Sequence, residues 1–242
     1  ELVVFDLNKE AVAELVACGA TSAKSSKEVA AQVEVVITMV PNSPHVRAAV
    51  LGKDGVAEGA KPGLVLIDMS SIDPTESKKI GEESGGEPKA IDGTLSVMVG
   101  GKKDLFDKYY DMLMVMAGSV VYVGDLGSGN VAKLANQMIV AINIAAVSEA
   151  LIFAKKAGTD PELVYQAIRG GLAGSTVMDA KAPMMLAGNY KPGFRIELHI
   201  KDLNNALNAA HAISSPAPLT AQLMEVMQFL RSEGCDKEDH SS

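Results

Sequence analysis

The sequence predicts an α/β domain with a parallel sheet, followed by an all-helical domain built on one long helix. Over residues 1–124, short apolar runs alternate with helical patterns, as in sheets whose strands are joined by helical crossovers. Beyond Gly124 the strand patterns stop, and residues 129–156 form one helical pattern of about 28 residues, about 42 Å long. We therefore expect two domains, residues 1–124 and 125–242.

Hydrophobic periodicity places the elements of the first domain in order. Strands are expected at residues 2–6, 35–40, 64–68, 95–99 and 120–123. Helices are expected at residues 9–17, 26–31, 74–83 and 102–116, with one more starting near residue 42. The alternation of strands and helices also calls for a turn and a strand after the helix at 74–83, but the sequence continues directly with Ser84, Gly85 and Gly86. Either the sheet lacks a strand there or a stretch of chain is missing, and we favour the second. We also expect a segment before residue 1.

The long helix carries apolar residues on all sides of its middle, among them Leu134, Ile139, Ile144 and Leu151. A helix that is apolar all round is normally buried. We therefore expect other helices to surround it, with the long helix as the spine of the second domain.

Composition excludes several classes of partner. The formal charge is −8, and no block of Lys and Arg is interleaved with aromatics, so a nucleic acid is not expected. The most apolar run, residues 138–147, is shorter than the roughly 20 residues that cross a bilayer, so no membrane span is predicted. Cys18 and Cys235 lie far apart without a metal-binding spacing, which favours reduced thiols in a cytoplasm and no metal.

Three strand ends indicate a dinucleotide site, because ligands of such sheets bind beyond the carboxyl ends of the strands. Asp6 can accept hydrogen bonds from both ribose hydroxyls of NAD and would repel a 2′-phosphate; its alternative role is to cap a helix. Met39, Val40 and Pro41, and Ser71 after a later strand, are the other predicted cofactor contacts. They also fit ordinary strand-to-helix turns. The glycine fingerprint that should precede Asp6 is not in the sequence.

A serine followed by two glycines is a candidate anion site. The backbone amides of Ser84, Gly85 and Gly86 can converge on a carboxylate, with the Ser84 hydroxyl as a further donor. The same tripeptide also occurs as a flexible turn. We predict that it binds the carboxylate of a small acid.

The most informative motif begins at Gly127 and ends at Gln137. Lys133 lies about one turn into an apolar helix, with Asn136 three and Gln137 four residues later, so three polar groups share one patch. A lysine buried in such a place needs a reason, so it is a candidate functional residue. The alternative is a lysine whose head group reaches the solvent at a helix end.

A second cluster of polar residues lies within residues 194–205. Lys201 is a candidate for the nicotinamide side of the site, with Asp202 as its partner. The alternative is an amphipathic helix with a solvated, charged face. The histidines form no catalytic triad or metal spacing, and we interpret His199 and His211 as structural.

With these residues in view, the chain closely resembles the β-hydroxyacid dehydrogenase family over nearly its whole length. The most specific parts are residues 84–101, 127–137, 170–175 and 191–202. The resemblance implies a Rossmann-like domain joined to an all-α domain through the long helix. It also implies that Ser84 to Gly86 bind substrate, that Lys133 is catalytic and that Lys201 lies near the cofactor. Many members carry Asn where this chain has Gln137, so whether Asn136 or Gln137 meets the substrate stays open.

The resemblance also implies an activity. Residues 170–175 and 191–195 favour the branch that reduces tartronate semialdehyde (2-hydroxy-3-oxopropanoate) to glycerate with NADH. The alternatives are a dehydrogenase of 3-hydroxyisobutyrate or a related β-hydroxy acid, and a non-catalytic cofactor-binding module. Family members associate through the helical domain, so we expect a homodimer or homotetramer.

Overall fold

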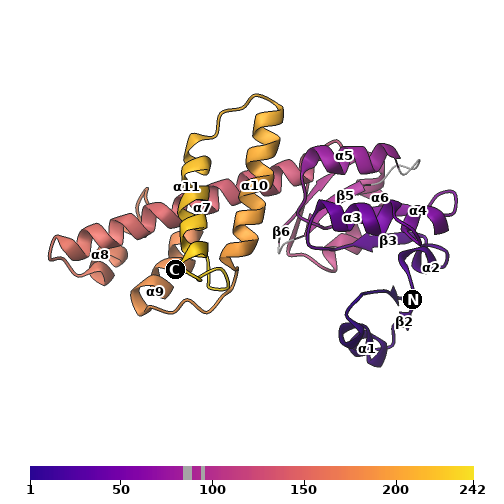
Figure 1. The fold of residues 1–242 in the computed structure, drawn as a ribbon, viewed down its shortest axis with the longest axis horizontal. Coiled ribbons are helices and arrows are strands. Elements are labelled where there is room, and N and C mark those ends of the chain that lie inside the picture. Colours follow the sequence, from indigo (N-terminus) through magenta and orange to yellow (C-terminus); the bar gives the residue numbers. More distant parts are fainter. Residues whose placement is uncertain (84–88, 94–95) are drawn as a thin grey trace. The chain divides into compact units, whose positions relative to one another are not determined.

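The structure is a computed structural model, and it describes residues 1–83, 89–93 and 96–242. The chain forms two compact units (Figure 1). We call Glu1–Lys133 the N-terminal unit and Leu134–Ser242 the helical unit. Ser84, Gly85 and Gly86, the predicted carboxylate site, lie outside the described residues.

The N-terminal unit alternates strands and helices, as predicted. Its strands are β1 (Val3–Val4), β2 (Thr21–Ser22), β3 (Val35–Thr38), β4 (Val65–Asp68), β5 (Lys89–Gly93), β6 (Ser96–Gly100) and β7 (Ser119–Gly124). Its helices are α1 (Lys9–Ala17), α2 (Ser26–Ala30), α3 (Ser43–Leu51), α4 (Val56–Gly59), α5 (Pro74–Glu83) and α6 (Lys103–Met114).

The main sheet has five strands in the order β3-β4-β5-β6-β7, and β1 pairs with β2 in a separate two-stranded sheet. All pairs are parallel except β5 with β6, which is antiparallel. Strand β5 was not predicted. Only two residues separate β5 from β6, and so short a link joins antiparallel neighbours, because a parallel pair needs a crossover connection.

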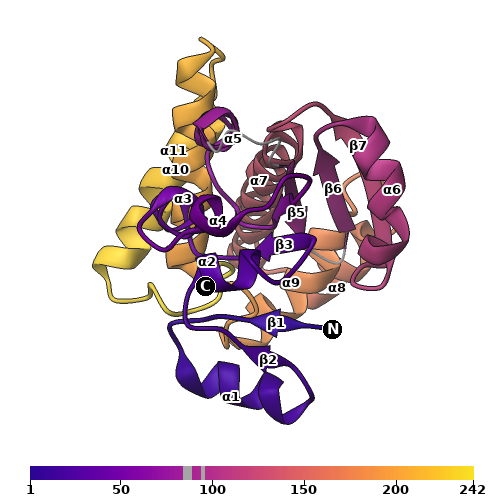
Figure 2. The ribbon, with the colours of Figure 1, turned by 90° about the vertical axis from the view of Figure 1, so that its right-hand side faces the viewer.

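Helices cover both faces of this sheet (Figure 2). Val36 and Leu66 point to the face covered by α3, α4 and α5, where they pack with Val46, Val50 and Ile80. Successive strand residues point to opposite faces, so the neighbours of Leu66 on β4 point to the other face. There β4, β6 and β7 pack against α6. The buried residues of this second cluster are Val65, Ile67, Val97, Val99, Leu113 and Val120.

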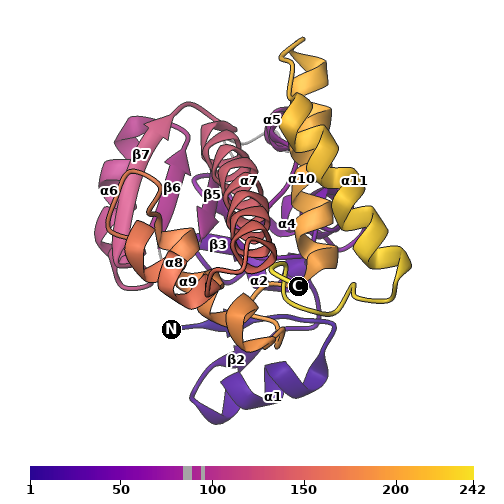
Figure 3. The same ribbon diagram turned by 90° about the vertical axis from the view of Figure 1, so that its left-hand side faces the viewer.

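The helical unit is built on α7 (Ser128–Lys156), which starts in the N-terminal unit. Figure 3 shows it with α8 (Pro161–Ile168), α9 (Thr176–Ala187), α10 (Ile196–Ala212) and α11 (Pro218–Ser232). Ala141 of α7 belongs to an apolar cluster with residues of α10 and α11. Val147 and Leu151 pack instead with α8 and α9. The long helix is thus the spine of this unit.

Helix α7 is also long and apolar enough to cross a membrane, judged by length and composition alone. The expectation of no membrane span rested only on the most apolar stretch of this helix, residues 138–147, which Asn143 interrupts. The central helix of a folded core meets the same criteria, and α7 contributes to both apolar clusters of the helical unit.

Candidate functional site

Two polar side chains end the neighbouring parallel strands β3 and β4. Thr38 and Asp68 are register partners, and Thr38 Oγ1 donates a hydrogen bond of 2.9 Å to Asp68 Oδ1. The Ser70 amide donates to the same oxygen at 3.1 Å. Burial raises the pKa of the Asp68 carboxyl, and the hydrogen bonds from Ser70 and Thr38 only partly offset this effect. Within the described residues, Asp68 Oδ2 is buried without a hydrogen-bond partner.

The loops after β3 and β4, which carry four predicted cofactor residues, are joined to each other. The Val40 amide donates a hydrogen bond of 2.9 Å to Ser70 Oγ. Met39 is 71% exposed, Pro41 is exposed and Ser71 is half-buried. The structure therefore places these residues at one edge of the sheet. The interaction between Thr38, Asp68 and Ser70 was not predicted, because the strand expected at residues 35–40 runs past Thr38, where β3 ends.

Asp6, the predicted ribose ligand, is exposed two residues after β1. Its Oδ1 accepts a hydrogen bond of 2.7 Å from the Asn8 amide. Asn8, and not Asp6, is the N-cap of α1, because its side chain accepts from the Glu10 and Ala11 amides. The alternative role of Asp6 as a helix cap is therefore wrong. Among the described residues, no hydrogen bond joins Asp6 to the loops after β3 and β4.

We call residues 127–137 the α7 motif, and packing and backbone conformation explain its glycines. A Cβ on Gly129 would lie 2.5 Å from the Met98 carbonyl oxygen, and one on Gly100 would lie 2.7 Å from the Gly129 amide nitrogen. Gly127 has φ +89°, in the left-handed region that favours glycine. These glycines let the first turn of α7 lie directly against β6, which sets the position of the residues that follow on the helix.

Lys133 follows one turn later and is 8% exposed. In the part of the chain that the structure describes, no hydrogen bond or ion pair holds its ammonium group. A buried ammonium is costly unless it is paired, so Lys133 marks a candidate ligand site. The low exposure disfavours a lysine that merely reaches the solvent.

Four predicted residues are joined in the helical unit. Asn136 Nδ2 donates to Gln137 Oε1 at 3.1 Å, and Gln137 Nε2 donates to Asp202 Oδ2 at 2.7 Å. The other oxygen of Asp202 lies 3.0 Å from Lys201 Nζ. We call Asn136, Gln137 and Asp202 the amide chain. The sequence predicted each member, but not that the helices α7 and α10 bring them together.

A buried pair of histidines lies beside the amide chain. His199 of α10 is fully buried, and its Nε2 lies 3.2 Å from the Gln137 carbonyl oxygen. Its Nδ1 lies 2.8 Å from Nδ1 of His240. Because a carbonyl only accepts, His199 carries its hydrogen on Nε2, and its Nδ1 accepts the hydrogen of His240 Nδ1. Burial, with the neighbouring His199, lowers the pKa of His240 to about 3.

The carboxyl-terminal turn is held by Asp239, which is fully buried. Lys181 Nζ lies 2.8 Å from one of its oxygens, and the Gly193 and Phe194 amides donate to the other. The Ser241 hydroxyl donates at 2.7 Å. Burial opposes ionisation, but these donors hold the pKa of Asp239 well below its usual range. The interpretation of His199 as structural did not include its contact with this turn. His199 and His240 are 41 positions apart in the sequence.

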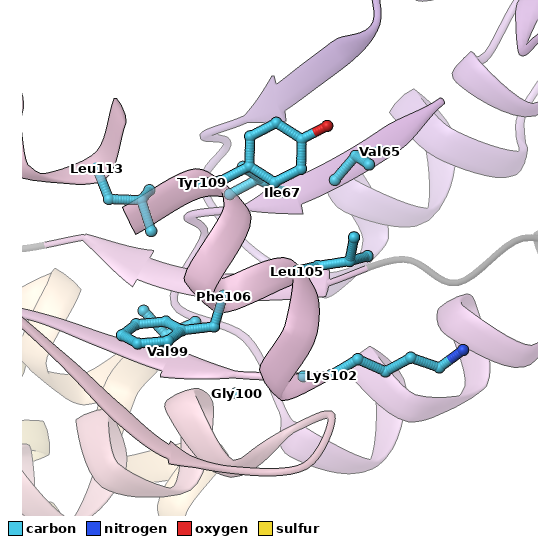
Figure 4. A pocket seen from close by; sticks show the side chains of 10 residues that line it. Val65, Ile67, Val99, Gly100, Lys102, Leu105, Phe106, Tyr109 and Leu113 are labelled. Carbon is cyan, nitrogen blue, oxygen red and sulfur yellow. The ribbon is translucent and has the colours of Figure 1, made fainter. Parts of the chain in front are cut away.

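Figure 4 shows a hollow between α6 and the strands β4 and β6. Its apolar walls include Val65, Ile67, Val99, Leu105, Phe106 and Leu113. The ammonium of Lys102 points away from them. The hollow is part of the packing of α6 on the sheet, and we assign no ligand to it.

Family profiles match both parts of the chain. Residues 1–124 match the NAD binding domain of 6-phosphogluconate dehydrogenase. Residues 127–242 match the NAD-binding profile of NADP-dependent 3-hydroxyisobutyrate dehydrogenase. The 2-hydroxy-3-oxopropionate reductase of Escherichia coli (strain K12) is 38% identical over 242 residues, which cover 95% of this chain and 83% of that relative. The chain belongs to the β-hydroxyacid dehydrogenase family.

Other members of the β-hydroxyacid dehydrogenase family are also similar. The 2-(hydroxymethyl)glutarate dehydrogenase of Eubacterium barkeri is 32% identical, with 98% of this chain and 84% of the relative covered. A solved structure of Mycobacterium tuberculosis 3-hydroxyisobutyrate dehydrogenase with L-serine has a TM-score of 0.90 and 26% identity. That match covers 98% of this chain and 87% of the solved one.

Membership in the β-hydroxyacid dehydrogenase family confirms three expectations. The chain has a Rossmann-like domain followed by helices, takes a nicotinamide cofactor and is an NAD(P)-dependent β-hydroxyacid dehydrogenase. The N-terminal unit fits such a cofactor, because Asp6 carries an exposed carboxylate of the kind that can accept hydrogen bonds from ribose hydroxyls, and the residue 39–41 loop lies at the carboxyl edge of the sheet.

Proposed function

We propose that the protein reduces tartronate semialdehyde (2-hydroxy-3-oxopropanoate) to glycerate, using NADH. The observation that carries this proposal is the polar patch of Lys133, Asn136 and Gln137 on α7, in a chain 38% identical to a bacterial 2-hydroxy-3-oxopropionate reductase. The same substrate is supported by residues 170–175 and 191–195, which resemble the branch of the family that reduces tartronate semialdehyde.

In the proposed reaction, Lys133 acts at the aldehyde oxygen. The hydride for the aldehyde carbon would come from a nicotinamide held in the proposed cofactor site. The Lys133 ammonium donates a hydrogen bond to the carbonyl oxygen and then transfers its proton there, which gives the alcohol and leaves a neutral amine. Water returns the proton afterwards. A buried ammonium without a counter-charge among the described residues favours this role, because a developing oxyanion is the partner it lacks.

The substrate carboxylate is assigned to Ser84, Gly85 and Gly86, as the sequence predicts. Their backbone amides and the serine hydroxyl supply the donors that an acid needs. In the cofactor site, we propose that Asp6, Met39, Val40, Pro41 and Ser71 contact the dinucleotide. Lys201 and Asp202 are proposed at its nicotinamide end.

We propose NADH as the preferred cofactor because Asp6 accepts hydrogen bonds from ribose hydroxyls and repels a 2′-phosphate. The first arginine of the chain is Arg47, so no arginine follows Asp6 closely in sequence. The hypothesis requires a higher kcat/KM with NADH than with NADPH, and it is abandoned if the two are equal or reversed.

A second candidate substrate is 3-hydroxyisobutyrate or a related β-hydroxy acid. It is supported by the structural match to the Mycobacterium tuberculosis 3-hydroxyisobutyrate dehydrogenase. We would assay NADH oxidation with a panel of small semialdehydes that carry hydroxyl, methyl or hydrogen at carbon 2. Highest kcat/KM with the hydroxyl compound supports the proposal, and highest kcat/KM with the methyl compound supports the alternative. No turnover with any of them would rule out both candidate substrates.

We also propose a cytoplasmic homodimer or homotetramer that associates through the helical unit. Large apolar side chains are exposed there, including Ile139 and Phe153 on α7, Leu163 on α8 and Phe229 on α11. Both cysteines are free thiols. Light scattering on the parent and on Phe153→Asp tests the association, since an interfacial charge should lower the molar mass of the particle.

A further inference from the structure

We propose that Asp202 sets the direction of the amide chain, so that Asn136 offers its carboxamide oxygen to the carbon-2 substituent of the substrate. Asp202 is thus a positioning residue and Asn136 a specificity-determining one. The inference rests on the proposed function for the kind of ligand, a three-carbon hydroxy acid.

The direction follows from what each group can do. A carboxylate only accepts, so Asp202 Oδ2 requires the NH2 group of Gln137, 2.7 Å away. The carboxamide oxygen of Gln137 must then point to the other side, where it accepts from Asn136 Nδ2 at 3.1 Å. Asn136 has used an amide hydrogen, and its oxygen points outward. One charge therefore orients two amides that are otherwise free to flip.

The same geometry decides which amide meets the ligand. Gln137 is 5% exposed, and both ends of its carboxamide are engaged within the protein. Asn136 is exposed, and within the described residues its Oδ1 has no hydrogen-bond partner. Asn136 also lies three residues after Lys133, on the same side of α7. Asn136 is therefore the ligand-facing amide, and Gln137 transmits the orientation.

Two further contacts keep the amide chain in place. The ammonium of Lys201 lies 3.0 Å from Asp202 Oδ1, which leaves Oδ2 for Gln137. His199 Nε2 lies 3.2 Å from the Gln137 carbonyl oxygen, which ties the α7 backbone to α10 at this residue. The amide chain is thus fixed at its charged end and at its middle.

An outward carboxamide oxygen selects hydrogen-bond donors. A hydroxyl or an ammonium at carbon 2 can donate to it, whereas hydrogen or methyl offers it no donor. We therefore expect the protein with NADH bound to hold glycerate and L-serine about tenfold more tightly than 3-hydroxypropanoate, which has only hydrogen at carbon 2. Calorimetric titration of these three acids measures the ratio without any turnover.

The decisive variant is Asp202→Asn. The new carboxamide turns its oxygen to Lys201 and its NH2 group to Gln137, which reverses both amides and makes Asn136 present a donor. We expect affinity for L-serine to fall about tenfold or more, because its ammonium cannot accept. A hydroxyl both donates and accepts, so glycerate should change by less than about threefold, and 3-hydroxypropanoate should be unaffected.

Two controls separate direction from charge. Glu197→Gln removes one carboxylate from the same helix and leaves the amide chain intact, so the three affinities should keep their order. In the double variant Gln137→Glu, Asp202→Asn, the carboxylate moves to position 137. There it accepts from Asn136 and from the new carboxamide at position 202. The original direction and the L-serine affinity should return to within about threefold of the parent.

Asn136→Ala changes an exposed side chain and so guards against a folding defect in the other variants. It should abolish the preference for glycerate and L-serine over 3-hydroxypropanoate. The inference is overturned if the parent shows no such preference, if Asn136→Ala keeps it, or if Asp202→Asn leaves the L-serine ratio unchanged. It is also overturned if Glu197→Gln lowers that ratio equally or if the double variant does not recover. Failure of the proposed function is seen separately, as absence of NADH oxidation with 2-hydroxy-3-oxopropanoate.

Discussion

The two halves of the α7 motif differ in what their residues are for. In the first half, Gly127 and Gly129 are required by backbone conformation and by the close approach of β6. In the second half, Lys133, Asn136 and Gln137 add polar groups to a helix that is otherwise apolar. The first half touches its neighbours through backbone, and Gln137 of the second half is held by the α10 side chains Asp202 and His199.

The difference shows how one motif combines two kinds of constraint. The glycines set where α7 starts, and therefore where a residue one turn later lies. The polar residues decide what that position does. Changes in the first half should cost stability, and changes in the second half should cost activity or specificity. The following predictions test that separation.

The largest expected effect is on turnover in Lys133→Met. Loss of the proton donor should lower kcat by about 10²- to 10⁴-fold, while the dissociation constant of NADH and the melting temperature stay near the parent values. Lys155→Met, at the exposed end of the same helix, is the matched control. Turnover within about threefold of the parent would contradict the mechanism and the separation of roles.

Gly129→Ala should mainly cost stability. The new Cβ would lie 2.5 Å from the Met98 carbonyl oxygen, which is backbone and cannot move aside cheaply. We expect the free energy of unfolding to fall by about 3 kcal/mol, measured by urea denaturation. Gly170→Ala is the control, because a Cβ there has no atom within 4 Å. Equal losses in the two variants would show that close approach to β6 is not the cause.

The buried pair His199 and His240, which packs against Gln137 of the motif, should make the free energy of unfolding sensitive to acid. The folded-state pKa of His240 is lowered from about 6.5 to about 3, so the unfolded chain binds a proton that the folded one excludes between these values. Stability is therefore complete above pH 6.5 and falls by about 1.4 kcal/mol per pH unit below it. We would measure the free energy of unfolding by urea denaturation at several pH values from 7 to 4. In His240→Asn, its dependence on pH should be weaker by this amount.

Asp239 contributes to the pH dependence of stability in a separate, lower pH range. Its folded-state pKa is lowered by its donors, so its stabilisation is present above the ordinary value near 3.8 and is lost only as the pH drops further. An unchanged slope between pH 6.5 and pH 4 in His240→Asn would contradict the assignment of that proton to His240.

The smallest effect is expected for Gly127→Ala. A φ of +89° costs an L-residue about 1 to 2 kcal/mol. The atoms nearest to the new Cβ are Cε of Lys78 at 3.1 Å, at the flexible end of its side chain, and the Pro74 carbonyl oxygen at 3.3 Å, near ordinary contact distance. Gly158→Ala has a similar φ of +79° with nothing within 4 Å. The two variants should lose nearly equal free energies of unfolding, and a much larger loss in Gly127→Ala would point to a packing role like that of Gly129.

Helices with strong local signals were predicted closely. Residues 9–17 and 74–83 are helical with the predicted bounds, because capping residues and hydrophobic periodicity act over a few positions. Strand β1 is shorter than predicted, and β5 was not predicted at all. A strand needs a partner for its hydrogen bonds, and the sequence of β5 does not show that it pairs with β4 on one side and β6 on the other.

The sequence by itself determined the alternation of strands and helices and the spine helix. It also determined the clustering of Lys133, Asn136 and Gln137, because residues three and four apart share one side of a helix. Only the tertiary structure decided that Asp202, 65 residues after Gln137, accepts its amide, and that His240 meets His199 across 41 positions. Such contacts are set by how helices pack, and local sequence patterns carry no record of that packing. The direction of the amide chain, and with it the inferred preference for donors at carbon 2, depends on those distant contacts.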